Sequence, residues 1–324
     1  MKLSTAGNNI SHLSNQRHRI AFHKGTQFSI MVCGESGVGK TTFINTLFQT
    51  TLKEPRDQDS RYKKQLSQTI DIEETRTEII EQQFKVNLNI IDTPGLGDYI
   101  NSYHSWNPII DYIDHQHERF MRQEQQPDRT QKEDHRVHVC LYFIRPTGGR
   151  LKALDIEIMK RLGSRVNLIP VISKADTLSS QELKQFKENI KADLDANYIH
   201  FYQCPIESEH EQTTKENKDL MAAMPFALIG STDLVPVPGG GTVRGRAYDW
   251  GVAEVENETH CDFVKLRHLL IRSHMLDLIE TTEYVHYENY RSKEMAVRQM
   301  GEPKCSNDPI LIEKEATMRN LLTD

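Results

Sequence analysis

The chain has 324 residues, of which 37% are hydrophobic and 27% are charged, with a formal net charge of −6 at pH 7. This acidic balance argues against nucleic-acid binding, and no stretch has the roughly 20 apolar residues of a membrane span or the apolar core of a signal peptide. The five cysteines stand singly, without a CxxC pair, which favours reduced thiols in the cytoplasm over a disulfide framework or a zinc site.

The first predicted strand leads into a glycine-rich phosphate-binding motif. Residues 1–25 are polar, and the apolar run Phe28–Cys33 is typical of a strand buried in a parallel sheet. Residues 34–41 (GESGVGKT) match GxxxxGK[ST] between that strand and a predicted helix, a context that a chance glycine-rich turn lacks. Glycines there let backbone N–H groups approach phosphate oxygens. The residues expected to bind the nucleotide are Gly34, Ser36, Gly37, Val38, Gly39, Lys40, Thr41 and Thr42.

Two motifs together predict a magnesium nucleotide site. Lys40 is expected to reach the β- and γ-phosphates, and Thr41 to ligate Mg²⁺ through its hydroxyl. A DxxG motif from Asp92 to Gly95 ends a second apolar strand; its carboxylate can hold magnesium through water, and the Gly95 N–H can sense the γ-phosphate. Small GTPases usually place a water-orienting glutamine directly after this motif. Here the residue is Leu96, so slow hydrolysis is expected.

Strands and helices alternate through most of the chain. Further apolar runs predict strands at Val86–Ile91, Val137–Ile144, Leu168–Ile172, Ile199–Cys204 and Phe226–Ile229. One helix is expected from Asn107, a cap residue followed by proline, and another where Ser179 and Glu182 have capping-box spacing. Residues 118–136 are nearly all polar and are expected to form a solvated helix end and loop. The alternation predicts an α/β fold: a three-layer, doubly wound, mostly parallel sheet.

A base-reading element follows the strand Leu168–Ile172. The sequence Ser173-Lys174-Ala175-Asp176 stands where guanine-specific GTPases carry [NT]KxD. A carboxylate at Asp176 can accept hydrogen bonds from the guanine N1–H and N2 amine, whereas adenine lacks both donors and would leave it unpaired. The Lys174 stem can pack along the ring plane. Although KxD alone is common in solvated turns, its position after the two phosphate motifs predicts GTP or GDP as the ligand.

The C-terminal third departs from a minimal P-loop domain. Residues 242–256 (TVRGRAYDWGVAEVE) predict a hairpin after the last core strand, and a helix with apolar residues from Phe263 to Ile279 follows. The tail from Gly301 is polar. Residues 310–322 suggest an amphipathic helix that is too short for a coiled coil.

With these motifs, the sequence resembles septins from about Phe28 to Arg291, of a fungal type without the long C-terminal coiled coil. The matching segments are GESGVGKTTFINTLF, IIDTPGLGD, RVHVCLYFI, SKADTL, PFALIGS, VRGRAYDWGVAEVEN and HYENYRS. The hairpin motif RGRxYxWG is the most specific, because it resembles the septin unique element that other P-loop GTPases lack. The resemblance implies assembly with other septin subunits through two alternating faces, one containing the nucleotide pocket and the other built from the N- and C-terminal helices.

The resemblance also implies roles for individual residues. Gly230 and Arg246 match septin residues that pack around guanine, and His138 and Trp250 match residues of the nucleotide-side interface. A second interpretation of Trp250 is that it fills the core beneath the hairpin. Because an aromatic residue between arginine and glycine in a polar hairpin is typical of an interface anchor, we favour the interface.

A switch threonine takes part in hydrolysis in catalytically competent septins, and Thr69 matches its place before an acidic strand. The resemblance therefore implies weak Mg²⁺-dependent GTP hydrolysis through Lys40, Thr41 and Thr69, with Thr69 also a magnesium ligand. A plain β-strand threonine is the alternative.

The predicted organisation is an N-terminal polar and basic segment (1–25), a septin-type GTPase domain (26–295) that includes a septin-unique region (231–290), and a polar tail (296–324). Septins often bind anionic lipid through a basic cluster before the first strand. Here that cluster is Arg17, Arg19 and Lys24, which predicts weak attraction to a membrane or, equally, a solvated helix face.

The expected function is that of a homo- or hetero-oligomeric filament subunit in cytokinesis and cortical scaffolding, located in the cytoplasm and cytoskeleton at the cell cortex or division site. The alternative is a monomeric switch GTPase, which would need neither the hairpin nor the apolar terminal helix. A P-loop kinase or ATPase is a third reading, and Asp176 argues against it.

Overall fold

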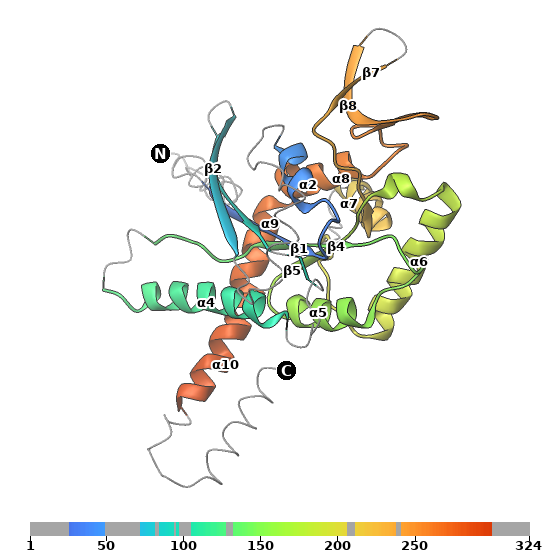
Figure 1. Cartoon of the computed structure of the whole chain (residues 1–324). Helices are drawn as coiled ribbons and strands as arrows, with labels where there is room; N and C mark the ends of the chain where they lie inside the picture. Colours follow the sequence, from blue (N-terminus) through green and yellow to red (C-terminus); the bar gives the residue numbers. More distant parts are fainter. Residues whose placement is uncertain are drawn as a thin grey trace, which may run out of the picture.

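The computed structural model describes residues 26–48, 72–81, 84–93, 95–96, 105–127, 132–205, 211–237 and 241–299. Within these ranges a six-stranded sheet has the strand order β2-β3-β1-β4-β5-β6 (Figure 1). Neighbouring strands pair in parallel, except that β2 is antiparallel to β3. The predicted α/β class with a mostly parallel sheet is therefore confirmed. The strands are β1 (Thr26–Gly34), β2 (Glu73–Glu81), β3 (Phe84–Asp92), β4 (Val139–Ile144), β5 (Asn167–Ile172) and β6 (Phe226–Ala227).

Helices cover both faces of this sheet. The core on one face includes side chains of α4 (Asn107–Glu124), α5 (Ala153–Gly163) and α6 (Ser180–Ala196). The core on the other face includes side chains of α2 (Lys40–Leu47) and α7 (Glu211–Ala223), together with the terminal helix. Successive residues of a strand point to opposite faces, so the nearly continuous apolar runs in the sequence fill two cores at once.

The terminal helix is longer than the sequence predicts. It consists of α8 (Phe263–Arg267), η3 (His268–Ser273), α9 (Met275–Thr281), η4 (Thr282–Tyr287) and α10 (Glu288–Gln299), with η3 and η4 in π-helical conformation. Its first part is an apolar helix as predicted, with Phe263, Leu266 and Leu269 fully buried. The predicted boundary between residues 295 and 296 falls inside α10.

The predicted hairpin is part of a three-stranded antiparallel meander. It consists of β7 (Leu234–Val237), β8 (Gly241–Tyr248) and β9 (Gly251–Glu254). The meander projects from the body of the molecule (Figure 1). The hairpin β8–β9 is confirmed, whereas β7 is a strand that its short sequence did not predict.

Residues 199–204 do not form the strand that their apolar run predicts. The Tyr202 N–H donates to the Leu168 carbonyl at 2.8 Å beside the first half of β5. The second half of the same edge, Val171 and Ile172, pairs with β6 instead. Within residues 199–204, Ile199, Tyr202 and Cys204 are buried all the same, so burial and not strand pairing explains the apolar run.

Local helix signals are confirmed with one shift. Ser179 caps α6 by accepting from the Glu182 N–H, and the Glu182 carboxylate accepts from the Ser179 N–H, which completes the capping box. At α4 the N-cap is Trp106, so Asn107 is the first helical residue and not the cap.

The polar segment 118–136 is not solvated throughout, which corrects the prediction. The helix α4 continues to Glu124, and Arg136 is only 2% exposed. Its guanidinium makes two hydrogen bonds to Asp134, at 2.9 and 2.7 Å, and stacks 3.7 Å from the Phe120 ring centroid. Pairing with a carboxylate and stacking on an aromatic ring allow an arginine to be buried, and neither is visible in a polarity pattern.

Candidate functional site

The glycine-rich loop joins β1 to α2 at the carboxyl end of the sheet. Gly34 ends β1, and a Cβ atom there would lie 2.5 Å from the Phe143 carbonyl oxygen of β4. Gly37 and Gly39 have φ values of 74° and 95°, in the region that only glycine adopts readily. Gly39 also caps α2 by accepting from the Phe43 N–H at 2.9 Å. The three predicted glycines are therefore required by close approach or by backbone conformation.

Lys40 starts α2 and folds back across this loop. Its ammonium donates to the Gly34 carbonyl at 2.9 Å and to the Glu35 carbonyl at 2.8 Å, and the residue is 8% exposed. A buried ammonium held by loop carbonyls is a fixed positive charge beside the loop, as phosphate binding requires.

The two predicted magnesium residues lie together. The Thr41 hydroxyl lies 3.4 Å from Asp92 Oδ2, and the Asp92 residue is 2% exposed at the end of β3. The adjacent Thr93 donates its hydroxyl to the Val32 carbonyl at 3.0 Å, which ties this turn to β1. A hydroxyl and a carboxylate are hard oxygen donors that suit Mg²⁺, so the residues present fit the ion.

The DxxG motif ends against the phosphate loop. The Leu96 N–H donates to the Gly34 carbonyl at 3.1 Å, and Leu96 forms an isolated parallel bridge with Glu35. The Leu96 side chain is 3% exposed, within the core that contains α4 and α5. It anchors the turn and presents no polar atom to a water. Gly95 lies directly before it, and Thr69 falls outside the described residues.

A clamp that the sequence did not predict holds the phosphate loop from outside. Arg145 Nε lies 2.7 Å from Glu35 Oε2, and Lys152 pairs with the other oxygen of the same carboxylate. Arg145 Nη2 also donates to the Ser36 carbonyl at 2.6 Å. These contacts connect the loop to the segment between β4 and α5. Nothing in their spacing identifies them, because the partners are more than a hundred positions apart in sequence.

The residues predicted to read the base converge where β5 ends. The Ser173 hydroxyl donates to the Ile144 carbonyl at 2.9 Å, and the Ala175 N–H donates to the Leu228 carbonyl at 3.0 Å. Between them, Lys174 adopts a left-handed conformation with φ 49°. These bonds fix the turn that presents Asp176 at the carboxyl edge of the sheet.

Residues from the meander reach Asp176. Arg246 Nη1 lies 3.0 Å from its Oδ2, and Arg246 Nε donates to the Gly230 carbonyl at 3.0 Å. The Tyr248 hydroxyl donates to the same Oδ2. Burial, and then the hydrogen bond to this carboxylate, raise the pKa of Tyr248. The structure thus brings the predicted residues Asp176, Gly230 and Arg246 together and adds Tyr248, which sequence reasoning missed although it lies in the RGRxYxWG motif.

Trp250 lies at the tip of the β8–β9 hairpin and is 73% exposed. Its ring stacks on Tyr248, with 4.8 Å between ring centroids and 5° between planes. This excludes the alternative in which Trp250 fills the core. Because Tyr248 touches Asp176, the exposed ring lies on the nucleotide side of the molecule.

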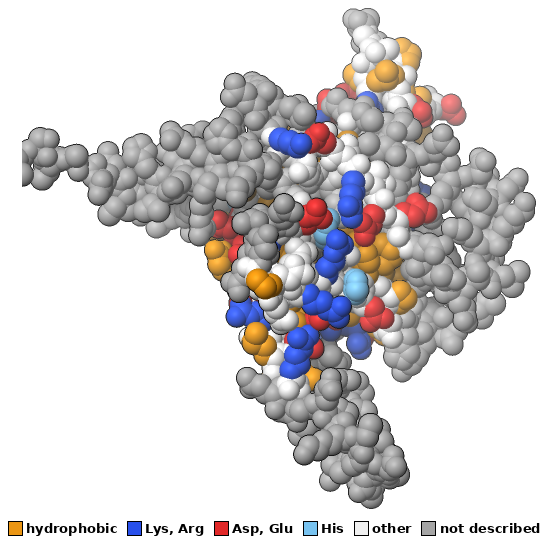
Figure 2. Space-filling view, turned by 90° about the vertical axis from the view of Figure 1, so that its left-hand side faces the viewer, with side chains coloured by type: hydrophobic (Ala, Val, Ile, Leu, Met, Phe, Trp, Pro, Cys, Tyr) orange, Lys and Arg blue, Asp and Glu red, His pale blue; other side chains and the backbone are white. Residues whose placement is uncertain are grey.

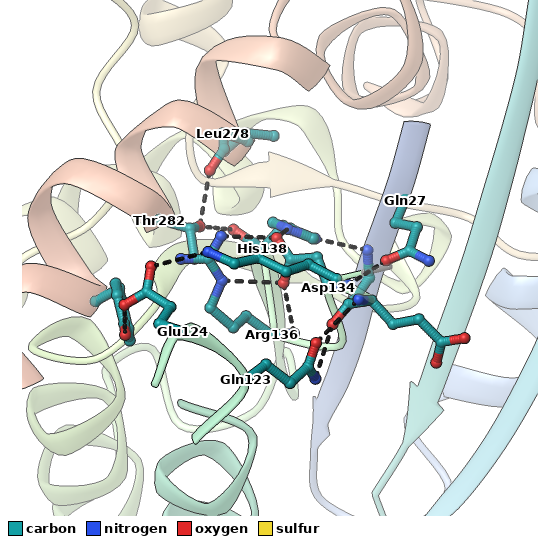
Figure 3. A network of polar contacts seen from close by, with 12 residues as sticks. Gln27, Gln123, Glu124, Asp134, Arg136, His138, Leu278 and Thr282 are labelled. Carbon is teal, nitrogen blue, oxygen red and sulfur yellow. Dashed lines mark hydrogen bonds and ion pairs between the residues drawn. The ribbon is translucent and has the colours of Figure 1, made fainter. Parts of the chain in front are cut away.

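The prediction that His138 lies at the nucleotide-side interface is wrong. The residue is 0% exposed and lies at the amino ends of the strands, opposite the phosphate loop. Its Nδ1 accepts from the Ser29 N–H at 2.9 Å, and its Nε2 lies 3.4 Å from Asp134 (Figure 3). Ser29 precedes Gly34 by five residues of β1, about 16 Å along a strand. His138 is therefore a buried residue near the terminal helix, where Thr282 Oγ1 lies 3.3 Å from its carbonyl, and its side chain is not available to a nucleotide-side partner.

Charged side chains of both signs are interspersed on the face that carries β2 and α4 (Figure 2). Arg122 and Arg298 both pair with Glu118, and Lys132 pairs with Glu124. In the described ranges no helix is both long and apolar enough to cross a bilayer. The predicted lipid-binding cluster, Arg17, Arg19 and Lys24, lies outside those ranges.

Comparisons with known proteins agree on one family. A family model described as "Septin" matches residues 24–304. Cell division control protein 12 of Saccharomyces cerevisiae is 45% identical over 340 residues, covering 97% of this chain and 83% of that protein. The Septin homolog spn4 of Schizosaccharomyces pombe is 44% identical over 317 residues, covering 97% and 83%, and human Septin-5 is 46% identical over 282 residues, covering 86% and 76%. The crystal structure of Cdc11 from Saccharomyces cerevisiae matches with a TM-score of 0.55 and 32% identity, covering 83% of this chain and 99% of that one.

Proposed function

The chain belongs to the septin family, and on that premise we propose that it is a GTP-binding subunit of septin filaments that acts in cell division. One observation carries the proposal: Arg246, from the meander that a minimal GTPase would not need, contacts both Asp176 and Gly230 at the base site. The family-specific meander and the guanine-reading turn thus form one site. A monomeric switch GTPase does not account for this arrangement.

The proposed nucleotide site spans the carboxyl ends of β1, β3 and β5. Backbone groups of residues 34–39 and the start of α2, including Thr42, would hold the phosphates, and Lys40 would neutralise their charge. Thr41 and Asp92 would hold Mg²⁺, which when bound offsets negative charge on the β- and γ-phosphates. Gly95 would contact the γ-phosphate. Lys174 would lie along the guanine ring, while Asp176 reads the base edge.

We infer slow GTP hydrolysis at this site. Leu96 is buried where an efficient GTPase carries a water-orienting glutamine, so the turn offers no side chain to position the attacking water. Lys40 and Thr41 would act on the phosphates, and Thr69 is proposed as the further catalytic and magnesium-binding residue by its match to septins. A nucleotide that is hydrolysed this slowly would act mainly as a structural ligand that sets the geometry of an interface.

Two assembly faces are proposed. Trp250 would anchor the nucleotide-side face, since a largely exposed aromatic side chain stacked on a second ring is typical of an interface anchor. The terminal helix would provide the other face, because it exposes Tyr284 at 56%, Val285 at 48% and Met295 at 41%. We further propose a location in the cytoskeleton at the cell cortex or division site, with weak attraction of the N-terminal cluster to anionic lipid.

Replacing Asp176 by Asn tests the proposed base reading. The carboxylate that accepts from the guanine N1–H and N2 amine becomes an amide, which can instead donate to the C2 carbonyl of xanthine. We expect Asp176→Asn to lose at least about ten-fold in GDP affinity and to gain affinity for xanthosine diphosphate, measured by titration calorimetry. Asp233→Asn, an exposed acidic residue beside β7, is the control and should leave both affinities unchanged. Unchanged GDP binding in Asp176→Asn, or displacement of GDP by ADP from the unmodified chain, would contradict the proposal.

A further inference from the structure

The Asp176 carboxylate is covered by two side chains of β8. Arg246 Nη1 lies 3.0 Å from Oδ2 and 3.4 Å from Oδ1, and the Tyr248 hydroxyl donates to Oδ2. With these donors in place the Asp176 side chain is only 1% exposed. A carboxylate oxygen has two lone-pair positions, so both positions of Oδ2 are used by the protein itself. A purine base can therefore reach this oxygen only if one of the two donors moves away.

Of the two donors, Tyr248 is the easier to displace. Arg246 is held by a second bond from Nε to the Gly230 carbonyl, and its charge compensates that of the buried Asp176. Removing one partner of a buried ion pair is strongly unfavourable. Tyr248 is neutral and 36% exposed, and its hydroxyl meets both Asp176 and Arg246, so its movement breaks hydrogen bonds of this hydroxyl but leaves the ion pair intact.

Trp250 supports Tyr248 from the solvent side. The two rings are nearly parallel in their stack, and both belong to the turn where β8 ends at Tyr248 and β9 begins at Gly251. Tyr248 pairs with Gly251 in the hairpin register. Displacing the tyrosine therefore also requires either breaking the stack or moving the hairpin tip with both rings.

We propose that Tyr248 is a positioning residue that gates guanine entry, holding the closed arrangement over Asp176 through its hydroxyl while Trp250 supports its ring. This inference rests on the proposed reading of guanine by Asp176. When a site is open for only a fraction of the time, its apparent dissociation constant for every ligand is the intrinsic constant divided by that fraction. A partner subunit that covers Trp250 restrains Tyr248 as well, so assembly through this face slows nucleotide exchange.

Tyr248→Phe tests the gate, because it removes the hydroxyl and keeps the ring that stacks on Trp250. The full chain is mixed with fluorescent GDP or inosine diphosphate (IDP) in a stopped-flow instrument at one fixed protein concentration. We expect about ten-fold faster association with both nucleotides, the size of effect for losing one hydrogen bond to a charged group. Tyr198→Phe is the matched control, since Tyr198 is 83% exposed after α6, and should leave both rates unchanged.

The comparison of GDP with IDP separates gating from an ordinary structural role. Hypoxanthine keeps the N1–H of guanine but lacks the N2 amine, so the affinity ratio of the two nucleotides reports how Asp176 meets the base. Opening precedes base contact, and Tyr248→Phe should therefore leave this ratio unchanged. An unchanged or slower association rate, or a reduced preference for GDP, overturns the gate, because Tyr248 would then orient Asp176 for the base.

The contribution of Trp250 is tested by a double-mutant cycle. Trp250→Ala should also speed association, but should add little in the Tyr248→Phe background, because both substitutions release the same hydroxyl contact. Independent, multiplying effects would contradict the supporting role of Trp250. If Asp176→Asn keeps its guanine preference, the base reading itself is wrong. If that preference is lost while Tyr248→Phe behaves like the unmodified chain, only the gate is wrong.

Discussion

Two histidines beside the terminal helix, one buried and one half-buried, stay without charge. His117 on α4 is 1% exposed and stacks on Tyr290, with 5.3 Å between ring centroids. Burial, reinforced by the Arg136 charge, lowers its pKa to about 3. His286 on η4 lies 3.2 Å from Asn167 Oδ1, and burial lowers its pKa to about 4. Both side chains therefore stay neutral in the folded protein at pH values where exposed histidines take up a proton.

These shifts predict that stability falls on mild acidification. Because the folded pKa lies below the unfolded value of about 6.5, the unfolded chain binds protons first as pH drops, at about 1.4 kcal/mol per pH unit and per histidine. The free energy of unfolding should fall by about 2 kcal/mol for each histidine between pH 7 and pH 5, and the loss should continue until pH passes below the folded pKa values of about 4 for His286 and about 3 for His117. Denaturant titrations at several pH values measure it.

The matched variants are His117→Phe and His115→Phe, since His115 is exposed on the same helix. The pH slope of stability should be shallower in His117→Phe and unchanged in His115→Phe. The test compares how steeply stability changes with pH, so a constant change in stability caused by the larger phenylalanine ring does not affect it. Equal slopes in all three proteins would show that His117 is not buried as a neutral group.

At the scale of elements, a polar cluster fixes the terminal helix to the amino-terminal edge of the sheet (Figure 3). Asn167 Nδ2 donates to the His138 carbonyl at 2.8 Å and to the Leu278 carbonyl at 2.9 Å, joining β5 to α9. Burial alone would raise the pKa of Asp134, but His138 and Arg136 outweigh it and hold the pKa well below its usual range. The helix proposed as an assembly face is thus anchored by hydrogen bonds as well as by apolar packing.

Arg136→Ala should destabilise the fold by about 3–5 kcal/mol, because it takes the guanidinium away from the Asp134 charge and removes the stack on Phe120. Arg122→Ala is the control, since Arg122 is 70% exposed in its pair with Glu118 and should cost at most about 1 kcal/mol. Thermal unfolding of both variants measures the difference. Equal, small losses of stability in the two variants would mean that the ion pair between Arg136 and Asp134 does not stabilise the fold.

The sequence predicted those elements whose signal is local. The phosphate loop, the turn at Asp176 and the capping box at Ser179 each depend on residues a few positions apart, and each lies in the structure at the start of a helix or helical turn. Burial that depends on distant partners could not be predicted this way. His138 matched a motif position but lies in the core, and Tyr248 was passed over because its contact with Asp176 spans 72 positions.

At the scale of the whole molecule, the proposed base site lies where the main sheet meets the meander. Asp176 follows a strand of the main sheet, while Arg246 and Tyr248 come from the projecting meander. Ser231 reinforces the junction, donating its hydroxyl to the Gly245 carbonyl at 2.7 Å. The proposed nucleotide site and the exposed ring of Trp250 thus share one junction, which is the physical reason to expect assembly and nucleotide retention together.

The most direct test of this account is a native mass spectrum of the full chain at low and moderate salt, with Trp250→Ala and Tyr198→Ala alongside. Both substitutions remove a largely exposed aromatic side chain, but only Trp250 stacks on Tyr248, which contacts Asp176. We predict dimers or longer oligomers that retain one guanine nucleotide per subunit in the unmodified chain and in Tyr198→Ala. Trp250→Ala should shift toward smaller species, by about ten-fold or more in dissociation constant. A strict monomer that exchanges nucleotide freely, or oligomers that Trp250→Ala leaves intact, would contradict the account.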